Sequence, residues 1–263
     1  MTVQILQWTA AVYLTAGLVA GLGLALETRQ LERASVALLA FGVLLHGASF
    51  ALLHIADDPP PLTDLRAACS FMAWIGTGFF LILLKRSRLQ RLVVLVAPAA
   101  FLGAFLAALR PPGGAPVGAA TGSWPHAHVL LASAGLSLLG LAGLAGVIFL
   151  VEHARLKSKK SLDRRLPLPS LEALDRVNAV TLAVGFLLLT LGVITGMVWL
   201  QTANGRPWSG AAHETWSLVA WAVYGTLVVA RFFTKQGSRQ AAASAVGGFA
   251  FLLFAVIGLE LIS

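Results

Sequence analysis

The sequence predicts an all-α, polytopic membrane protein with about eight transmembrane helices. Apolar residues make up 58% of the 263 residues and charged residues only 11%, a balance far from that of soluble globular domains. The apolar residues gather in windows long enough to cross the hydrocarbon layer, which takes roughly 20 helical residues. Eight such windows use the whole length, so we expect residues 1–263 to form a single transmembrane helical domain.

Each predicted span is bounded by polar or proline-rich residues. Because lipid offers backbone groups no hydrogen-bond partner, these long apolar windows are expected to be helices. The first has no basic residues before it and no small-residue cleavage site after it, so it is predicted to be a span and not a signal peptide. The sixth helix is expected to begin before its span, with Ser170 as N-cap and Glu172 in its first turn. The predicted spans cover residues 5–26, 34–55, 65–84, 92–109, 127–151, 177–200, 213–233 and 241–261.

Basic residues alternate strongly between the two sides of the predicted membrane. Residues 27–33, 85–91, 153–176 and 231–239 hold sixteen Lys and Arg, whereas the alternate connections hold three. Basic connections stay in the cytoplasm, so both termini are predicted to be extracytoplasmic. The net charge of +8 is therefore explained by membrane orientation and not by nucleic-acid binding, and we expect a multi-pass protein of the bacterial inner membrane.

The stretch from Trp199 to Trp221 carries four tryptophans and one histidine at the outer ends of two predicted spans. Aromatic rings beside an imidazole suit a flat, metal-bearing ligand, because neutral imidazole is a common axial ligand of haem iron. On a helix, His213 and Trp216 share a face, whereas Trp221 is offset from it. An aromatic belt at the membrane surface explains the tryptophans too, so both interpretations stay open at this point.

Other histidines gather on the same predicted side. His46 lies about a dozen residues into its span, where an ionisable group is costly and usually faces the bundle interior. It is either an axial ligand or a histidine hydrogen-bonded to a neighbouring helix. His126 and His128 open the fifth span near the membrane surface, as ligands or as solvated residues. Zinc is not expected, because the two rings diverge on a helix and no Cys or Glu completes a ligand set.

The sequence gives no support for catalysis by side chains. It contains no nucleotide-binding loop, no Ser-His-Asp arrangement and no carboxylate pair, so we do not expect an enzyme. Cys69 is the single cysteine, which excludes a Cys-x-x-Cys-His haem attachment site and a disulfide framework. Any haem is therefore expected to be bound non-covalently.

The tryptophan-rich stretch resembles a known family. Residues 208–216 (WSGAAHETW), followed by SLVAWAVY, are similar to the outer motif W-S-W-D-P-K-E-T-W of cytochrome c assembly proteins of the CcsA/CcmC type. The preceding LDRVNAVTLAVGFLLLTLGVITGMVW resembles the helix that leads into that motif. His46 with the following Gly-Ala-Ser, and His128 with Val129, resemble the family's transmembrane and outer-face haem-ligand histidines.

The chain departs from the motif at several positions. Gly210 and Ala211 stand where the motif has its second Trp and its Asp, and His213 replaces the Lys. Val229 and Glu260 stand where later histidines of the family are expected. These departures make the chain more similar to the smaller HemX-like and YpjD-like branch of the superfamily.

The resemblance implies a membrane protein that positions haem b at the outer face during cytochrome c biogenesis or haem supply. Besides lipid, it implies assembly proteins or haem-biosynthesis enzymes as partners. The rival interpretation is a non-haem scaffold or regulator of haem biosynthesis, acting through the basic inner loop 153–169. A transporter is less favoured, because neither broken helices nor a repeat is evident. The implied ligands are His46, His128 and His213, with Trp208, Trp216 and Trp221 as an aromatic platform.

Overall fold

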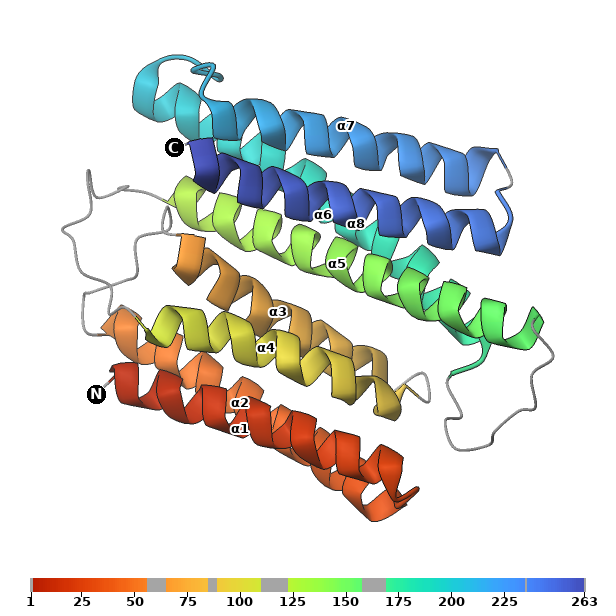
Figure 1. Ribbon diagram of the computed structural model, residues 1–263. Coiled ribbons are helices and arrows are strands. Elements are labelled where there is room, and N and C mark those ends of the chain that lie inside the picture. Colours follow the sequence, from red (N-terminus) through yellow and green to blue (C-terminus); the bar gives the residue numbers. More distant parts are fainter. Residues whose placement is uncertain are drawn as a thin grey trace. The chain divides into compact units, whose positions relative to one another are not determined.

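The computed structural model describes residues 2–55, 65–84, 89–109, 123–157, 169–234 and 236–262, which form helices and no strand (Figure 1). The predicted all-α class is confirmed, with eight α-helices and one short 3-10 helix over these residues. Within the described ranges, seven of the α-helices are long and apolar enough to cross a membrane. The helices are α1 (Thr2–Ala25), α2 (Arg29–Ile55), α3 (Leu65–Leu84), η1 (Gln90–Leu92), α4 (Val93–Ala108), α5 (Ser123–Lys157), α6 (Leu171–Asn204), α7 (Ala212–Phe233) and α8 (Ser238–Ile262).

Helices α5 and α6 are longer than the spans predicted for them, with 35 and 34 residues. The apolar windows 127–151 and 177–200 continue into polar residues that remain helical at both ends. At α6 the predicted N-cap is confirmed, since the Ser170 hydroxyl accepts a hydrogen bond from the Ala173 N–H at 3.2 Å. The other end of α6 stops at Gly205, which adopts a left-handed conformation.

The chain forms two compact units, and each is described by itself. The first contains Met1–Ala119 and Asp163–Pro169, and the second contains Ala120–Leu162 and Ser170–Ser263. In the first unit α1 packs on α2 and α4, and α3 packs on α4. In the second unit α5 and α6 form the most extensive helix pair, and α8 packs on α5 and α7. A single domain over the whole chain stays a prediction.

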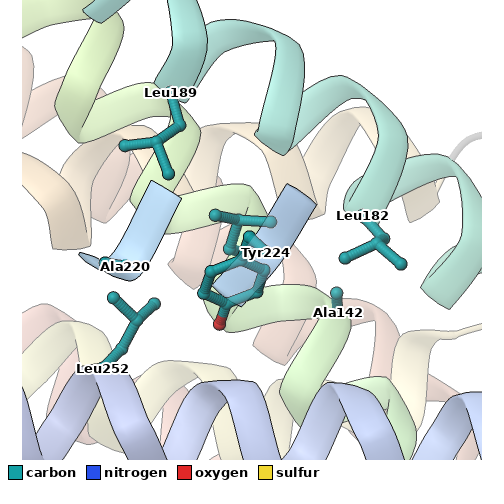
Figure 2. Packing of buried hydrophobic residues seen from close by; sticks show 7 residues of the cluster. Ala142, Leu182, Leu189, Ala220, Tyr224 and Leu252 are labelled. Atoms are coloured by element: carbon teal, nitrogen blue, oxygen red, sulfur yellow. The ribbon is translucent and has the colours of Figure 1, made fainter. Parts of the chain in front are cut away.

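A buried apolar cluster holds the four helices of the second unit together (Figure 2). Tyr224 of α7 is fully buried at its centre, with Leu252 of α8 beside it. Between membrane-spanning helices there is no hydrophobic gain from burial, so close van der Waals packing of this cluster fixes how α5, α6 and α7 lie against one another. The remaining members come from α5, α6 and α7: Leu139, Ala142, Leu182, Leu189 and Ala220.

Candidate functional site

A cavity lies in the second unit, where the start of α5, the end of α6 and the start of α7 meet. Its cavity volume is about 80 Å³, it widens into a space of about 540 Å³ that includes open solvent, and apolar side chains form most of its wall. Its apolar wall with a few polar groups suits a flat, mostly apolar ligand, and a large one would extend from the cavity into the open space beside it. We call it the α5–α7 cavity; its lining includes His128, Gly196, Met197, Trp199, Trp208 and Glu214.

The imidazole of His128 is held in one tautomer by a hydrogen bond to α6. Its Nδ1 lies 2.7 Å from the carbonyl oxygen of Gly192. A carbonyl oxygen can only accept, so Nδ1 carries the proton and Nε2 of the neutral ring keeps its lone pair. Within the described residues Nε2 has no hydrogen-bond partner. His128, which lines the cavity, therefore keeps one imidazole nitrogen that makes no hydrogen bond to the described residues.

Gly196 makes this position of the imidazole possible. A Cβ added at Gly196 would lie 2.8 Å from Nδ1 and 2.9 Å from Cε1 of His128, closer than side chains tolerate. Gly192, one turn earlier on the same face of α6, approaches Ala132 of α5 equally closely. The absence of side chains at these two glycines thus lets α5 and the His128 ring lie directly against α6.

Trp199 is the aromatic side chain next to His128, with ring centroids 6.1 Å apart. It follows Gly192 by seven residues and Gly196 by three, so helical spacing places all three on one face of α6. The predicted platform did not include Trp199. Its spacing from the two glycines is the signal that could have placed it in the site.

Trp208 is the member of the predicted aromatic platform that lines the α5–α7 cavity. It belongs to the segment of residues 205–211 that joins α6 to α7, and it is half exposed. The carboxylate of Glu214, in the first turn of α7, accepts hydrogen bonds from the backbone N–H and the hydroxyl of Ser209. Glu214 was absent from the predicted site, although it also lines the cavity.

Trp216 and Trp221 lie outside the residues that line the cavity. The Trp216 ring packs against Phe251 and Phe254 of α8, at centroid distances of 6.1 and 6.4 Å. Trp221 stacks on Phe186 of α6 and donates from Nε1 to a threonine hydroxyl of α6 at 3.0 Å. In this arrangement both rings pack helices together, and a role in holding a ligand stays a prediction.

The backbone of His213 lies in the first turn of α7, directly before Glu214. Its side chain lies outside the described part of the structure, and so does that of His54. His126 is exposed at the start of α5, and His153 stacks on Phe149 near the other end of that helix. Neither of these two lines the α5–α7 cavity.

His46 is fully buried in the first unit and has partners on both ring nitrogens. Nε2 lies 2.9 Å from the hydroxyl oxygen of Ser70 in α3, and Nδ1 lies 3.4 Å from the Tyr13 hydroxyl oxygen in α1. The ring also stacks on Phe50, with centroids 5.1 Å apart. This geometry matches a histidine hydrogen-bonded to neighbouring helices, and ligation of iron through Nε2 would require Ser70 to release it.

The donor set of the cavity fits a metal that arrives already coordinated. Among the described residues no group of three or more His, Cys, Asp and Glu side chains lies close enough to hold a metal ion. Haem iron is held by the porphyrin's own ring nitrogens and needs only an axial ligand, for which one imidazole suffices. An apolar cavity with Trp199, Trp208 and a free Nε2 on His128 matches that requirement.

Comparison with known proteins shows the family to which the chain belongs. The sequence profile of the family described as Cytochrome C assembly protein matches residues 62–263. The chain therefore belongs to the cytochrome c assembly protein family. Tyr13 and His46 lie before the matched region, whereas every residue of the α5–α7 cavity lies within it.

Individual relatives carry the name cytochrome c biogenesis protein CcsA. The protein from Thermosynechococcus vestitus is 28% identical over 242 residues, covering 77% of this chain and 76% of the relative. The protein from Chlamydomonas reinhardtii is 29% identical over 212 residues, covering 77% of this chain and 58% of the relative. A shorter match to the Prochlorococcus marinus (strain MIT 9303) protein reaches 42% identity over 91 residues, 35% of this chain and 29% of that protein.

These findings confirm the predicted superfamily and a multi-pass membrane location. The name that these relatives share associates them with cytochrome c biogenesis. The HemX-like and YpjD-like branch stays a prediction, as do the individual ligand residues.

Proposed function

We propose that the chain binds haem b non-covalently in the α5–α7 cavity, at the outer face of a bacterial inner membrane, during cytochrome c biogenesis. The observation that carries this proposal is the hydrogen bond from Nδ1 of His128 to the Gly192 carbonyl. In the neutral ring this bond leaves Nε2 with a lone pair that can bind a metal. The outer-face location follows from the Lys and Arg distribution, which assigns the ends of α6 and α7 at the cavity to the extracytoplasmic side.

The proposed ligands of the haem iron are His128 and His213. His213 precedes Glu214, a residue of the cavity wall, so its backbone lies at the edge of the cavity. Trp199 and Trp208 would cover the faces or edges of the macrocycle, and the bound iron would supply redox chemistry set by its axial ligands. A deeper ligand role for His46 remains a separate proposal, because it lies in the other compact unit.

In this proposal the protein positions and protects haem and catalyses no reaction with its own side chains. It acts as an assembly factor, and the covalent chemistry of cytochrome c maturation belongs to partner proteins. Haem-biosynthesis enzymes are further candidate partners through the basic residues 153–169. Arg155 and Lys157 are the described basic residues of that segment.

A visible spectrum of the protein purified in mild detergent tests the proposal. We expect a Soret band, either as isolated or after addition of haemin, that is lost in a His128→Ala, His213→Ala double variant. His126→Ala is the matched control, since this exposed histidine lies two residues from His128 outside the cavity. Its band should equal that of the wild type. A colourless wild-type protein that takes up no haemin would favour the non-haem regulator.

A further inference from the structure

The segment that joins α6 to α7 forms part of the cavity wall, although all of its residues are exposed. We call this segment, residues 205–211, the α6–α7 strap. Gly205 and Gly210 have φ angles of 69° and 82°, so the strap turns sharply at both ends. Between these turns lies Trp208, which lines the α5–α7 cavity. Because Trp208 is only half buried, its packing holds it at the cavity in part, and a polar attachment would add to that.

The side chain of Glu214 supplies that attachment. Its Oε2 accepts from the Ser209 backbone N–H at 2.7 Å, and its Oε1 accepts from the Ser209 hydroxyl at 2.6 Å. The same hydroxyl oxygen accepts from the backbone N–H of Ala211 at 3.3 Å. Hydrogen bonds to a carboxylate are shorter and stronger than neutral ones, so this pair fixes the residue next to Trp208.

These bonds are not those of an ordinary helix cap. In a capping box the glutamate of the first turn bonds to the backbone N–H of the N-cap residue itself. Here the N-cap of α7 is Ala211, which has no side-chain cap, and Glu214 reaches past it to Ser209. The carboxylate thus ties the strap to α7 instead of only closing the helix end.

We propose that Glu214 is a positioning residue of the haem site, which holds the α6–α7 strap so that Trp208 stays at the cavity. This inference rests on the haem-binding function proposed above. Glu214 acts through Ser209 and the strap, and His128 and His213 remain the proposed ligands of the iron. Without the two Glu214–Ser209 hydrogen bonds, the glycine turns allow the strap to move, and Trp208 no longer stays beside the bound ligand.

Three variants and a control test the proposal on the full-length protein in detergent. Glu214→Ala removes both hydrogen bonds, Glu214→Gln keeps an oxygen that can accept one of them, and Ser209→Ala removes only the hydroxyl bond. Glu172→Gln is the matched control, because Glu172 also lies in the first turn of a long helix but is exposed at the far end of α6. Circular dichroism and gel filtration establish that each variant folds.

The first readout is backbone hydrogen exchange of residues 205–211 without haemin, and the second is the rate at which added haemin passes to apomyoglobin. We expect Glu214→Ala to speed both by about tenfold, the range that loss of hydrogen bonds to a charged group predicts. Glu214→Gln and Ser209→Ala should be intermediate, and Glu172→Gln should match the wild type. The Soret maximum should not shift, because His128 is untouched.

Two results would overturn the positioning role. One is wild-type exchange of the strap in Glu214→Ala; the other is faster exchange with unchanged haemin release, while wild-type binding still depends on His128. A wild-type protein that binds no haemin is a different failure, since it rejects the proposed function and the haem-positioning role with it. Should Glu214→Ala fail to fold, Ser209→Ala decides the question by the same two readouts.

Discussion

Arg231, near the end of α7, donates from one guanidinium nitrogen to both carboxylate oxygens of Asp175 in α6, at 2.8 Å each. Both side chains are largely buried, with exposed fractions of 12% and 25%. The pair joins the ends of α6 and α7 that lie opposite to the cavity. Together with the Tyr224 cluster, it fixes the two helices whose other ends form the cavity wall.

Asp175→Ala is expected to destabilise the protein. Removal of one partner leaves the Arg231 charge largely buried without its carboxylate, and we expect a loss of about 2–4 kcal/mol in the free energy of unfolding. Glu172→Ala is the control, because the Glu172–Arg176 pair is exposed by 83% and 75% and should contribute about 0.5 kcal/mol or less. Unfolding of both variants in detergent gives the comparison. Equal losses would show that the Asp175–Arg231 pair has no special role.

Gly196→Ala should disturb the haem site and not the fold. The new methyl group would contact Nδ1 and Cε1 of His128, so the ring must move or α6 must shift. We expect haemin affinity to fall at least about tenfold, which corresponds to 1.4 kcal/mol. The control is Gly247→Ala in α8, where an added Cβ meets no atom within 4 Å. Titration of haemin, followed by the Soret band, would contradict this prediction if both variants bound alike.

Trp208→Ala and Trp216→Ala should change different properties, haemin binding in the first and stability in the second. Trp208 lines the cavity and is half exposed, so its loss should weaken haemin binding with little change in stability. Trp216 packs on Phe251 and Phe254, so its loss should lower the free energy of unfolding by about 1–3 kcal/mol and spare haemin binding. Haemin titration and unfolding of both variants test this separation. Weaker haemin binding in a stable Trp216→Ala variant would instead support the platform predicted from the sequence.

Ser70→Ala distinguishes the two roles considered for His46. In the structure the Ser70 hydroxyl is the partner of Nε2, so its removal should cost about 1–2 kcal/mol of stability and leave the haemin spectrum unchanged. The opposite result is haemin uptake that rises in Ser70→Ala and is abolished by adding His46→Ala. That outcome would support His46 as a deeper ligand. Ser49→Ala is a control, since among the residues that the structure describes its hydroxyl bonds to the His46 backbone carbonyl and not to the ring.

The sequence predicted the helices well because hydropathy reports directly which residues tolerate lipid. The predicted spans of α5 and α6 are shorter than the helices that contain them, since a helix does not stop where its apolar residues stop. Ser170 was recognisable because a cap is a local feature. The division into two compact units depends on contacts between distant residues, for which the sequence carries no local signal.

The candidate site was predictable only in part. His128 and Trp208 were predicted as site residues from the sequence, and both line the same cavity in the structure. Periodicity showed which residues share a face of α7, but not which helix that face meets. The structure shows that the face carrying Trp216 meets α8. The partners of His46 come from α1 and α3, and no spacing within α2 could reveal them.

The length of α5 and α6 sets the depth at which the cavity lies. At 1.5 Å per residue these helices measure about 50 Å, whereas the hydrocarbon core of a bilayer is roughly 30 Å thick. Both must therefore project into the headgroups and water, and the cavity sits near one pair of their ends. A cargo held there would be within reach of a soluble polypeptide that never enters the lipid.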